Sequence, residues 1–300
     1  MKPGISAIIV VSNQIDLLKN CLKSIYLWVD EIILIDLESS DDIKTLATFY
    51  KAKYVLSKKV QVVEEIRESS LSYANHEYVL FLDPDETIPP LLAKDLKQKV
   101  ESREFDYFVT PRQNIVFGKW VRHSRWWPDH QTRLFRQGHA SWGTSLHAEV
   151  KKTGRGYTYD SDPNYSIQHE NYRNLDEFIL KNMRYAKHDA ESRLKSNESY
   201  SLVKAMKLSI SELVSRFYVA EGYRDGMHGL MLSILQSYYY FLVYGYYWEV
   251  KKYSSPESLE DLKSFPRAWF KHGLFEVIHW GGNIHFVAKI KNKLARRLLK

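Results

Sequence analysis

Short apolar runs alternate with longer amphipathic segments through the first hundred residues of the chain. The runs have the length and the β-branched content of buried strands, and they are residues 5–11, 31–36, 53–56 and 78–82. The other segments have helical spacing, and they are residues 15–27, 41–51, 61–74 and 90–100. This alternation forms βαβ units, so the sequence predicts an α/β fold with a mainly parallel sheet and helices on both faces.

The last of these predicted strands runs into a group of carboxylates. Asp83, Pro84, Asp85 and Glu86 follow it directly. Ligands of open α/β sheets bind just outside the carboxyl ends of the strands. Two carboxylates at that place are hard oxygen donors, which suit Mg²⁺ or Mn²⁺ together with substrate phosphates. The stretch indicates a site for a sugar nucleotide or another phosphate ester, although Asp and Pro are also ordinary turn formers.

Two further acidic residues come at loop exits of the same predicted sheet. Asp36 ends the second strand, and Asp41 starts the next helix. Because the carboxyl ends of parallel strands meet at one edge, we expect both to share a rim with Asp83 and Asp85. Each of them alone is more often a cap or a turn residue, but several together favour a ligand site.

Charge and cysteine content exclude several classes of protein. The 300-residue chain has a net charge of +7, but residues 286–300 hold six basic side chains and no acid. The basicity therefore belongs to the C-terminal tail and does not indicate a nucleic-acid-binding surface. The single cysteine, Cys21, excludes an intramolecular disulfide, and its apolar helical surroundings predict a buried structural thiol. No secretory signal is recognised, so we expect a cytoplasmic protein.

The composition changes after the first hundred residues. Residues 105–170 are rich in aromatic side chains, His and Arg. From Asn174, an expected N-cap, the chain is predicted to be helical. The first of these helices is expected to present one apolar face, with Leu175, Phe178, Ile179 and Met183. A further short helix is expected to start at Ser255-Pro256.

Five stretches together resemble glycosyltransferase family 2, the inverting enzymes of the GT-A type. They are ISAIIV at 5–10, DEIILID at 30–36 with SSD at 39–41, LFLDPDE at 80–86, FGKWVRH at 117–123 and WPDHQTRLFR at 127–136. The last two are similar to the branch that contains lipopolysaccharide-core β-glucosyltransferases. The resemblance implies a GT-A fold with a C-terminal helical extension. It also implies three parts, which are a nucleotide-sugar-binding half over 1–112, an acceptor-binding part over 113–175 and the extension over 176–300.

The resemblance also implies roles for residues on the donor side. Asp36 and Asp41 would seat the uracil and the ribose, and Arg67 would face the nucleotide. Asp83 would meet the ribose or the metal. Asp85 would bind the Mg²⁺ or Mn²⁺ ion that bridges the diphosphate.

On the acceptor side, Asp129 resembles the catalytic base of the family. His169, at the end of its own predicted strand, would be a further ligand of the metal or the phosphate. The expected acceptor-binding residues are Trp120, Trp126, Trp127 and Arg133. Structural alternatives remain open: Asp129 could cap a turn, and His169 could be a hydrogen-bonded core histidine. Trp126 and Trp127 could be packing residues, and Arg133 could bind phosphate or be a solvated residue of a helix.

The implied activity is inverting, metal-dependent transfer of a sugar from a nucleotide sugar, in particular a UDP-sugar, to a saccharide or lipid-linked acceptor. Such a reaction needs charge neutralisation on the leaving diphosphate and a base near the acceptor hydroxyl. Two alternatives stay open. Asp83 and Asp85 also fit the Asp-x-Asp-x-Thr motif of haloacid-dehalogenase-like phosphatases, and departures from the family motifs would suit a non-catalytic carbohydrate- or membrane-binding relative.

Two segments suggest contact with a membrane. Residues 229–248 carry no charge but contain six tyrosines, and residues 286–300 are basic and amphipathic. We expect peripheral contact with the inner face of the membrane, with packing in an oligomer or in the core, or a membrane span, as the alternatives.

Overall fold

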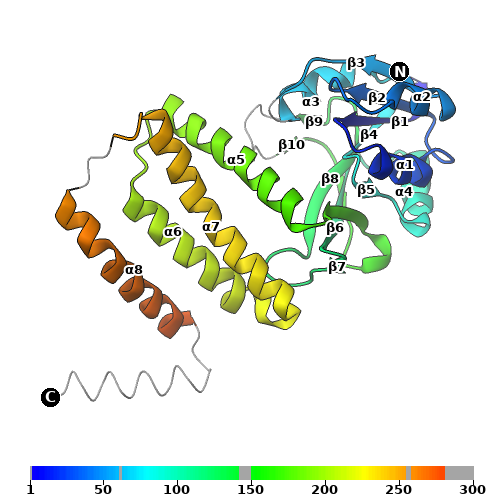
Figure 1. The fold of residues 1–300 in the computed structure, drawn as a ribbon. Coiled ribbons are helices and arrows are strands. Elements are labelled where there is room, and N and C mark those ends of the chain that lie inside the picture. The colour runs from blue at the N-terminus through cyan, green and yellow to red at the C-terminus, as the bar shows by residue number, and fades with distance from the viewer. Residues whose placement is uncertain (1, 61–62, 142–149, 255–257, 281–300) are drawn as a thin grey trace. The chain divides into compact units, whose positions relative to one another are not determined.

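The apolar runs of the N-terminal part form neighbouring strands of one sheet (Figure 1). The computed structural model describes residues 2–60, 63–141, 150–254 and 258–280. The strands are β1 (Lys2–Val11), β2 (Glu31–Asp36), β3 (Lys53–Leu56), β4 (His76–Leu82), β5 (Glu86–Thr87), β6 (Tyr107–Val116), β7 (Lys119–Trp120), β8 (Asp129–Arg136), β9 (Ala140–Ser141), β10 (Lys151–Lys152), β11 (Gly156–Thr158) and β12 (Ile167–Tyr172). The α-helices are α1 (Ile15–Ile25), α2 (Ile43–Phe49), α3 (Glu64–Ser70), α4 (Pro90–Ser102), α5 (Leu175–Lys195), α6 (Leu202–Val214), α7 (Met227–Val250) and α8 (Leu259–Trp280). Shorter helical turns are η1 (Leu71–Tyr73), η2 (Pro163–Tyr165), η3 (Ser215–Val219) and η4 (Gly222–Asp225).

The main sheet combines a parallel part with a mixed part. Its strand order is β3-β2-β1-β4-β8-β6-β12-β5. The first four of these strands, which are the predicted ones, are parallel to one another. Strand β8 then runs antiparallel to both β4 and β6, while β12 is parallel to β6. The predicted α/β class with a C-terminal helical extension is confirmed.

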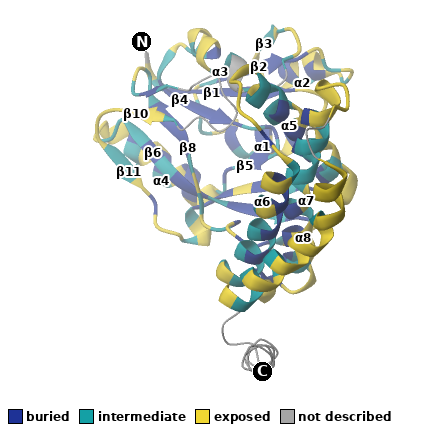
Figure 2. Ribbon diagram, turned by 90° about the vertical axis from the view of Figure 1, so that its left-hand side faces the viewer, coloured by how far each residue is buried: buried dark blue, intermediate teal, exposed yellow. Residues whose placement is uncertain are grey.

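Side chains of β1 alternate between the two faces of the sheet, as strand geometry requires. Ile5, Ala7 and Ile9 belong to a buried cluster with side chains of α1, α2 and α4. Ile8 and Val10 belong to a second buried cluster, against which α3 packs. Helices therefore cover both faces, as predicted, and Figure 2 shows β1 and β4 in the colour of buried residues.

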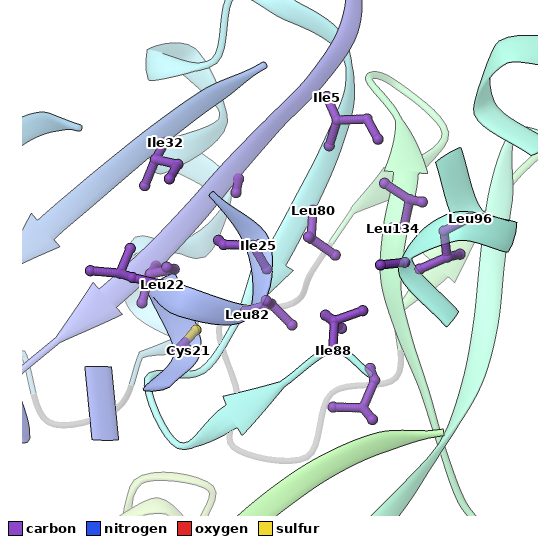
Figure 3. Packing of buried hydrophobic residues seen from close by; sticks show 14 of the residues in the cluster. Ile5, Cys21, Leu22, Ile25, Ile32, Leu80, Leu82, Ile88, Leu96 and Leu134 are labelled. Carbon is purple, nitrogen blue, oxygen red and sulfur yellow. The ribbon is translucent and has the colours of Figure 1, made fainter. Parts of the chain in front are cut away.

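Cys21 is part of the first cluster (Figure 3). It lies on the buried face of α1 with Leu22 and Ile25, and Leu82 at the end of β4 belongs to the same cluster. Burial raises the pKa of the Cys21 thiol well above its ordinary value. The predicted structural thiol is confirmed.

The second helix begins slightly later than the sequence indicates. Helix α2 starts at Ile43, and its N-cap is Asp42, whose side chain accepts a hydrogen bond from the N–H of Thr45 at 3.0 Å. Asp41, which we expected to start this helix, therefore lies before the cap. Both residues are acidic neighbours, so the sequence alone could not show which one caps the helix.

The chain divides into two units, each with a core of its own. The first comprises Met1–Trp120 and Trp127–Arg173, and the second comprises Val121–Trp126 and Asn174–Lys300. In the second unit, α5, α6 and α7 share a buried cluster. Its members are Ala186, Ala190, Tyr200, Ala205, Val243 and Tyr247.

Helix α5 begins as predicted but buries a different face. Asn174 is its N-cap, and its Oδ1 accepts a hydrogen bond from the N–H of Glu177 at 2.9 Å. Leu175 and Met183 of the expected apolar face are 50% and 38% exposed. The buried positions of α5 are Phe178, Asn182, Ala186 and Ala190. Because most of these side chains are small or polar, the apolar pattern could not reveal this face.

The uncharged stretch 229–248 lies in α7 and contributes to the core of the second unit. Its fully buried residues are Gly229, Leu232, Ser233, Ser237, Val243 and Tyr247. A Cβ on Gly229 would lie 1.8 Å from the carbonyl oxygen of Gly222, so α7 approaches η4 closely at a residue without a side chain. None of the helices in the described ranges combines the length and the apolar character that crossing a bilayer requires.

The last described helix is longer than predicted. Helix α8 spans 22 residues from Leu259, whereas we expected a short helix from Ser255-Pro256. The expected starting residues and the basic tail 286–300 lie outside the described residues.

Candidate functional site

Three adjacent strand pairings bring together residues that are far apart in the sequence. Strands β8, β6, β12 and β5 lie side by side in that order. Asp129 of β8 pairs with Arg112 of β6 in the register of the sheet. His169 of β12 pairs with Asn114 on one side and with Glu86 of β5 on the other. The sheet therefore places the predicted base and the predicted histidine ligand on the two strands that flank β6.

Asp83, directly after β4, is held by two arginines. Its Oδ1 accepts a hydrogen bond from Nη2 of Arg67 at 3.1 Å, and its Oδ2 accepts one from Nη2 of Arg133. Burial alone would raise the pKa of Asp83, but the guanidinium groups of Arg133 and Arg67 outweigh it and hold this pKa far below its usual range. Asp83 is thus ionised, and both of its oxygens have cationic partners.

Glu86 connects this pair to the next strand. Its side chain has no exposed surface, and Oε1 accepts hydrogen bonds from Nη2 of Arg133 at 2.6 Å and Nη1 of Arg112 at 2.8 Å. Its Oε2 accepts a hydrogen bond from the N–H of Asp83 at 3.2 Å. We call the continuous row of ion pairs the charge network, with the members Arg67, Asp83, Arg133, Glu86, Arg112 and Asp129.

Asp129 lies at the far end of the charge network. Its Oδ2 accepts hydrogen bonds from Nε and Nη2 of Arg112 at 2.9 and 2.6 Å and from Nδ2 of Asn114 at 3.0 Å. Its Oδ1 accepts one from Nε2 of Gln131 at 2.7 Å. Burial would raise the pKa of Asp129, but Arg112 and these donors together lower it. The carboxylate is oriented, ionised and a quarter exposed, at 25%.

Asp85 and His169 form the second part of the site. Nε2 of His169 lies 3.4 Å from Oδ2 of Asp85, and Nδ1 of His169 lies 2.8 Å from Oδ1 of Asn114. Asp85 also lines a cavity of about 220 Å³. The other lining residues are Leu17, Asn20, Thr87, Gln168 and Glu170.

A carboxylate and an imidazole are suitable donors for a divalent cation. Asp85 and His169 could supply two ligands, and diphosphate oxygens and water the others, as is usual for Mg²⁺. Within the described ranges, no group of three or more His, Cys, Asp or Glu side chains is arranged for metal binding. The protein part of this candidate metal site is therefore small, which suits an ion that arrives together with a phosphate ligand.

Asp36 is the last residue of β2 and Asp41 lies in the loop that follows it, and both have partners of their own. Oδ2 of Asp36 accepts a hydrogen bond from the hydroxyl of Tyr54 at 2.8 Å, and its Oδ1 accepts one from the N–H of Ser39 at 2.9 Å. Asp41 accepts hydrogen bonds from the N–H groups of Gln14 and Ile15 at 3.1 and 3.2 Å. The contacts of Asp41 fix the start of α1, and those of Asp36 fix the loop after β2 and the side chain of Tyr54. None of these contacts includes a member of the charge network.

The predicted acceptor residues have different surroundings. Trp120 and Trp127 pack edge to face, with their ring centroids 5.2 Å apart, and both are half-buried. Trp126 belongs to the second unit, is buried, and lies under the guanidinium of Arg216 at 5.7 Å. Arg133 is 4% exposed and paired with carboxylates. These surroundings favour packing for Trp126 and an internal role for Arg133.

Sequence reasoning missed the residues that join the site together. Arg112 and Asn114 were not singled out, and Glu86 was read only as the end of a motif. Arg112 and Asn114 are separated from Asp129 by more than a dozen residues and meet it only because β6 pairs with β8. The polar residues within the otherwise apolar strand β6 were the one available signal.

Comparison with known proteins gives several matches. A family model described as glycosyl transferase family 2 matches residues 6–156, half of the chain. An uncharacterized glycosyltransferase of Rickettsia conorii is 21% identical over 262 residues, which cover 79% of this chain and 87% of that protein. A TPR repeat-containing protein of Synechococcus elongatus is 28% identical over 132 residues, which cover 44% of this chain but only 31% of that protein.

Among solved structures, the chain is similar to S. aureus TarS 1-349, with a TM-score of 0.43 and 15% identity over 86% of this chain and 93% of that one. It is also similar to glucosyl-3-phosphoglycerate synthase from Mycobacterium tuberculosis, solved with Mn²⁺ and UDP. That match has a TM-score of 0.32 and 22% identity over 36% of this chain and 43% of that one.

Acid should destabilise the protein through Asp83 and Asp129, two carboxylates of the site with lowered pKa values. In the unfolded chain Asp83 and Asp129 return to an ordinary pKa of about 3.9. The unfolded state then binds protons more readily, so the free energy of unfolding should fall as the pH drops below about 4. Urea unfolding between about pH 6 and pH 3 would measure this loss.

Asp129→Asn provides the control, because it removes one of the two groups. The variant should start with a lower stability at about pH 6 but lose less on acidification. A wild-type free energy of unfolding that does not change across this range would contradict the expectation.

Proposed function

This chain belongs to glycosyl transferase family 2, and we propose that it transfers a sugar with inversion from a UDP-sugar to a saccharide or lipid-linked acceptor. Membership makes it a nucleotide-sugar-dependent glycosyltransferase. The identity of the donor nucleotide, the stereochemistry of the transfer and the class of acceptor are proposals that go beyond this membership. The observation that supports them best is the connected arrangement of Asp85, His169, Asn114 and Asp129, in which Asp85 also lines a cavity.

We propose Asp85 and His169 as the residues that hold Mg²⁺ or Mn²⁺ when the donor binds. The ion would supply charge neutralisation for the departing diphosphate. Asp83, fixed by Arg67 and Arg133, would bind a ribose hydroxyl through its remaining lone pairs, since an ionised carboxylate can accept about four hydrogen bonds. Asp36 and Asp41 would shape the uracil pocket through the loops that they hold.

Asp129 is the proposed base for the acceptor hydroxyl. It is partly exposed, and its orientation is fixed by Arg112, Asn114 and Gln131. The paired rings of Trp120 and Trp127 offer an apolar surface on which a sugar ring could lie. The assignment to the lipopolysaccharide-core branch rests on residues 117–123 and 127–136 and stays a prediction.

A phosphatase reaction through Asp83 is disfavoured. An aspartyl nucleophile needs a free oxygen that can attack phosphorus. Both oxygens of Asp83 accept hydrogen bonds from guanidinium groups, and its strongly lowered pKa marks a poor nucleophile. The haloacid-dehalogenase alternative is therefore not proposed.

A thermal-shift screen of nucleotide sugars with and without Mn²⁺ tests the proposed donor. We expect UDP-sugars to raise the Tm of the wild type, with a larger effect when Mn²⁺ is present. Asp85→Ala should lose the Mn²⁺-dependent part and lower turnover by about 100-fold or more, while its unliganded Tm stays close to that of the wild type. Wild-type turnover of this variant with Mn²⁺ would remove Asp85 from the metal site.

Asp129→Asn tests the proposed base. The amide cannot take a proton from the acceptor hydroxyl, so kcat should fall by about 100-fold or more. Donor affinity, measured by the same thermal shift, should stay within about twofold because the carboxylate does not touch the diphosphate side of the site. A large loss of donor binding instead would move Asp129 out of the base role.

We also propose that the protein docks peripherally on the inner face of an anionic membrane through α8. Phe270, Leu274 and Phe275 on this helix are 73%, 40% and 63% exposed. Lys263, Arg267 and Lys271 recur every four residues among them and are also exposed. We call these six residues the basic–apolar face.

This combination fits a lipid surface better than a second protein. A helix with exposed aromatic and aliphatic side chains next to Lys and Arg can lie in the headgroup region of anionic lipid. Basic residues outnumber acids on this face: Glu260 precedes Lys263 by one turn, whereas Glu276 is half-buried near His272. The tail beyond Trp280 contributes further basic residues of the same sign.

Co-sedimentation of the full chain with vesicles tests this surface. We expect binding to vesicles with phosphatidylglycerol but not to pure phosphatidylcholine. The reversal K263E/R267E/K271E should weaken binding by about 100-fold, since each basic residue near the surface contributes about 1 kcal/mol. The matched control K23E/K94E/K97E changes the charge equally on exposed residues of α1 and α4 and should bind like the wild type.

Two results would overturn the membrane surface. One is equal loss of binding in both triple variants, which would indicate a general charge effect. The other is an unchanged affinity for vesicles together with a dimer that only the α8 variant dissociates, which would assign this face to a second copy of the chain.

A further inference from the structure

Asn114 connects the two parts of the proposed site through a single amide. Its Nδ2 donates a hydrogen bond to Oδ2 of Asp129 at 3.0 Å, and its Oδ1 lies 2.8 Å from Nδ1 of His169. Asn114 and His169 are both buried, with exposed fractions of 1% and 4%. A buried amide that is hydrogen-bonded at both ends cannot turn over. The partner of its NH₂ group therefore determines which group faces the partner at the other end.

The orientation of this amide follows from the charge on Asp129. An ionised carboxylate can only accept hydrogen bonds, so the group of Asn114 that faces it must be the NH₂. The carbonyl oxygen then faces His169. Asn171 also donates a hydrogen bond to this oxygen, at 3.1 Å, which agrees with the same assignment.

The orientation of the amide in turn fixes the tautomer of His169. Because Oδ1 of Asn114 is an acceptor, Nδ1 of His169 must carry the hydrogen. In the neutral ring Nε2 then has its lone pair, and it lies 3.4 Å from Oδ2 of Asp85. These two acceptor atoms repel each other unless a proton or a cation lies between them. The arrangement is therefore suited to binding a cation between His169 and Asp85.

We propose that Asn114 is a positioning residue that holds the Nε2 lone pair of His169 toward Asp85 and links this pair to the ionised Asp129. The inference rests on the proposed metal-dependent transfer and adds a residue that the donor motifs do not contain. It explains why a polar amide is buried in the interior of β6. It also means that one side chain contributes both to metal binding and to the orientation of the base.

NMR of the ¹⁵N-labelled full chain without substrate tests the tautomer. The His169 signal is identified by its loss in His169→Gln. In the wild type at about pH 7.5 we expect the Nδ1–H tautomer to dominate. Asn114→Leu keeps the size of the side chain but removes the acceptor, so the Nε2–H tautomer should become prominent, whereas Asn114→Asp keeps an acceptor and should retain Nδ1–H.

Mn²⁺ titration followed by electron paramagnetic resonance, with UDP present, gives the second measurement. Asn114→Leu should weaken Mn²⁺ binding by about 10- to 100-fold, which is the usual effect of removing a partner of a histidine ligand. Gln131→Leu is the matched control, because it removes a hydrogen bond from Asp129 but leaves Asn114 and His169 intact. Its Mn²⁺ affinity should stay within about threefold of the wild type.

The outcomes separate this inference from the proposed function. A wild type that binds no Mn²⁺ in the presence of UDP would overturn both. Wild-type Mn²⁺ affinity in Asn114→Leu, or a dominant Nε2–H tautomer in the wild type, would overturn the role of Asn114 alone and leave the metal-dependent transfer in place.

Discussion

The site depends on the ion pairs that one buried guanidinium, that of Arg133, forms with two carboxylates. Arg133 lies almost without exposure on β8 and donates hydrogen bonds to both Asp83 and Glu86, the residues on either side of Asp85 in the turn after β4. Removing one partner of a buried ion pair typically costs about 3–5 kcal/mol, because the remaining charge stays buried. The turn that carries the proposed metal ligand is therefore fixed by a charge from another strand.

The antiparallel strand β8 brings side chains to the site that the parallel part of the sheet does not supply. The parallel part β3-β2-β1-β4 alone would present carboxylates at its edge, as many α/β sheets do. Insertion of β8 between β4 and β6 brings Arg133 to the end of β4 and Asp129 next to Arg112. Strand β12 then adds His169 from the other side of β6. The residues proposed for the donor and the acceptor thus come from different parts of the chain but share one hydrogen-bonded sheet.

Local patterns in the sequence were sufficient for the parallel part of the fold. Apolar runs of strand length are visible without partners, and the position of Asp83 and Asp85 follows from the rule for strand ends. The partners of those residues are not local. Arg133 was expected to bind the acceptor, and its contacts with Asp83 and Glu86 become visible only once β4 and β8 are paired. Asn114 and Arg112 were missed for the same reason.

The charge network also affects how much the base and the donor side would each lower the barrier of the proposed reaction. General-base catalysis is most effective when the pKa of the base lies near the working pH. Arg112 and the other donors lower the pKa of Asp129, so it is ionised at neutral pH but has little tendency to take a proton early in the reaction. Proton transfer would then follow the departure of the diphosphate, and most of the barrier would have to be lowered on the donor side. This explains why the strongest fixed charges of the site are gathered around Asp83 and Glu86, beside the proposed metal ligand.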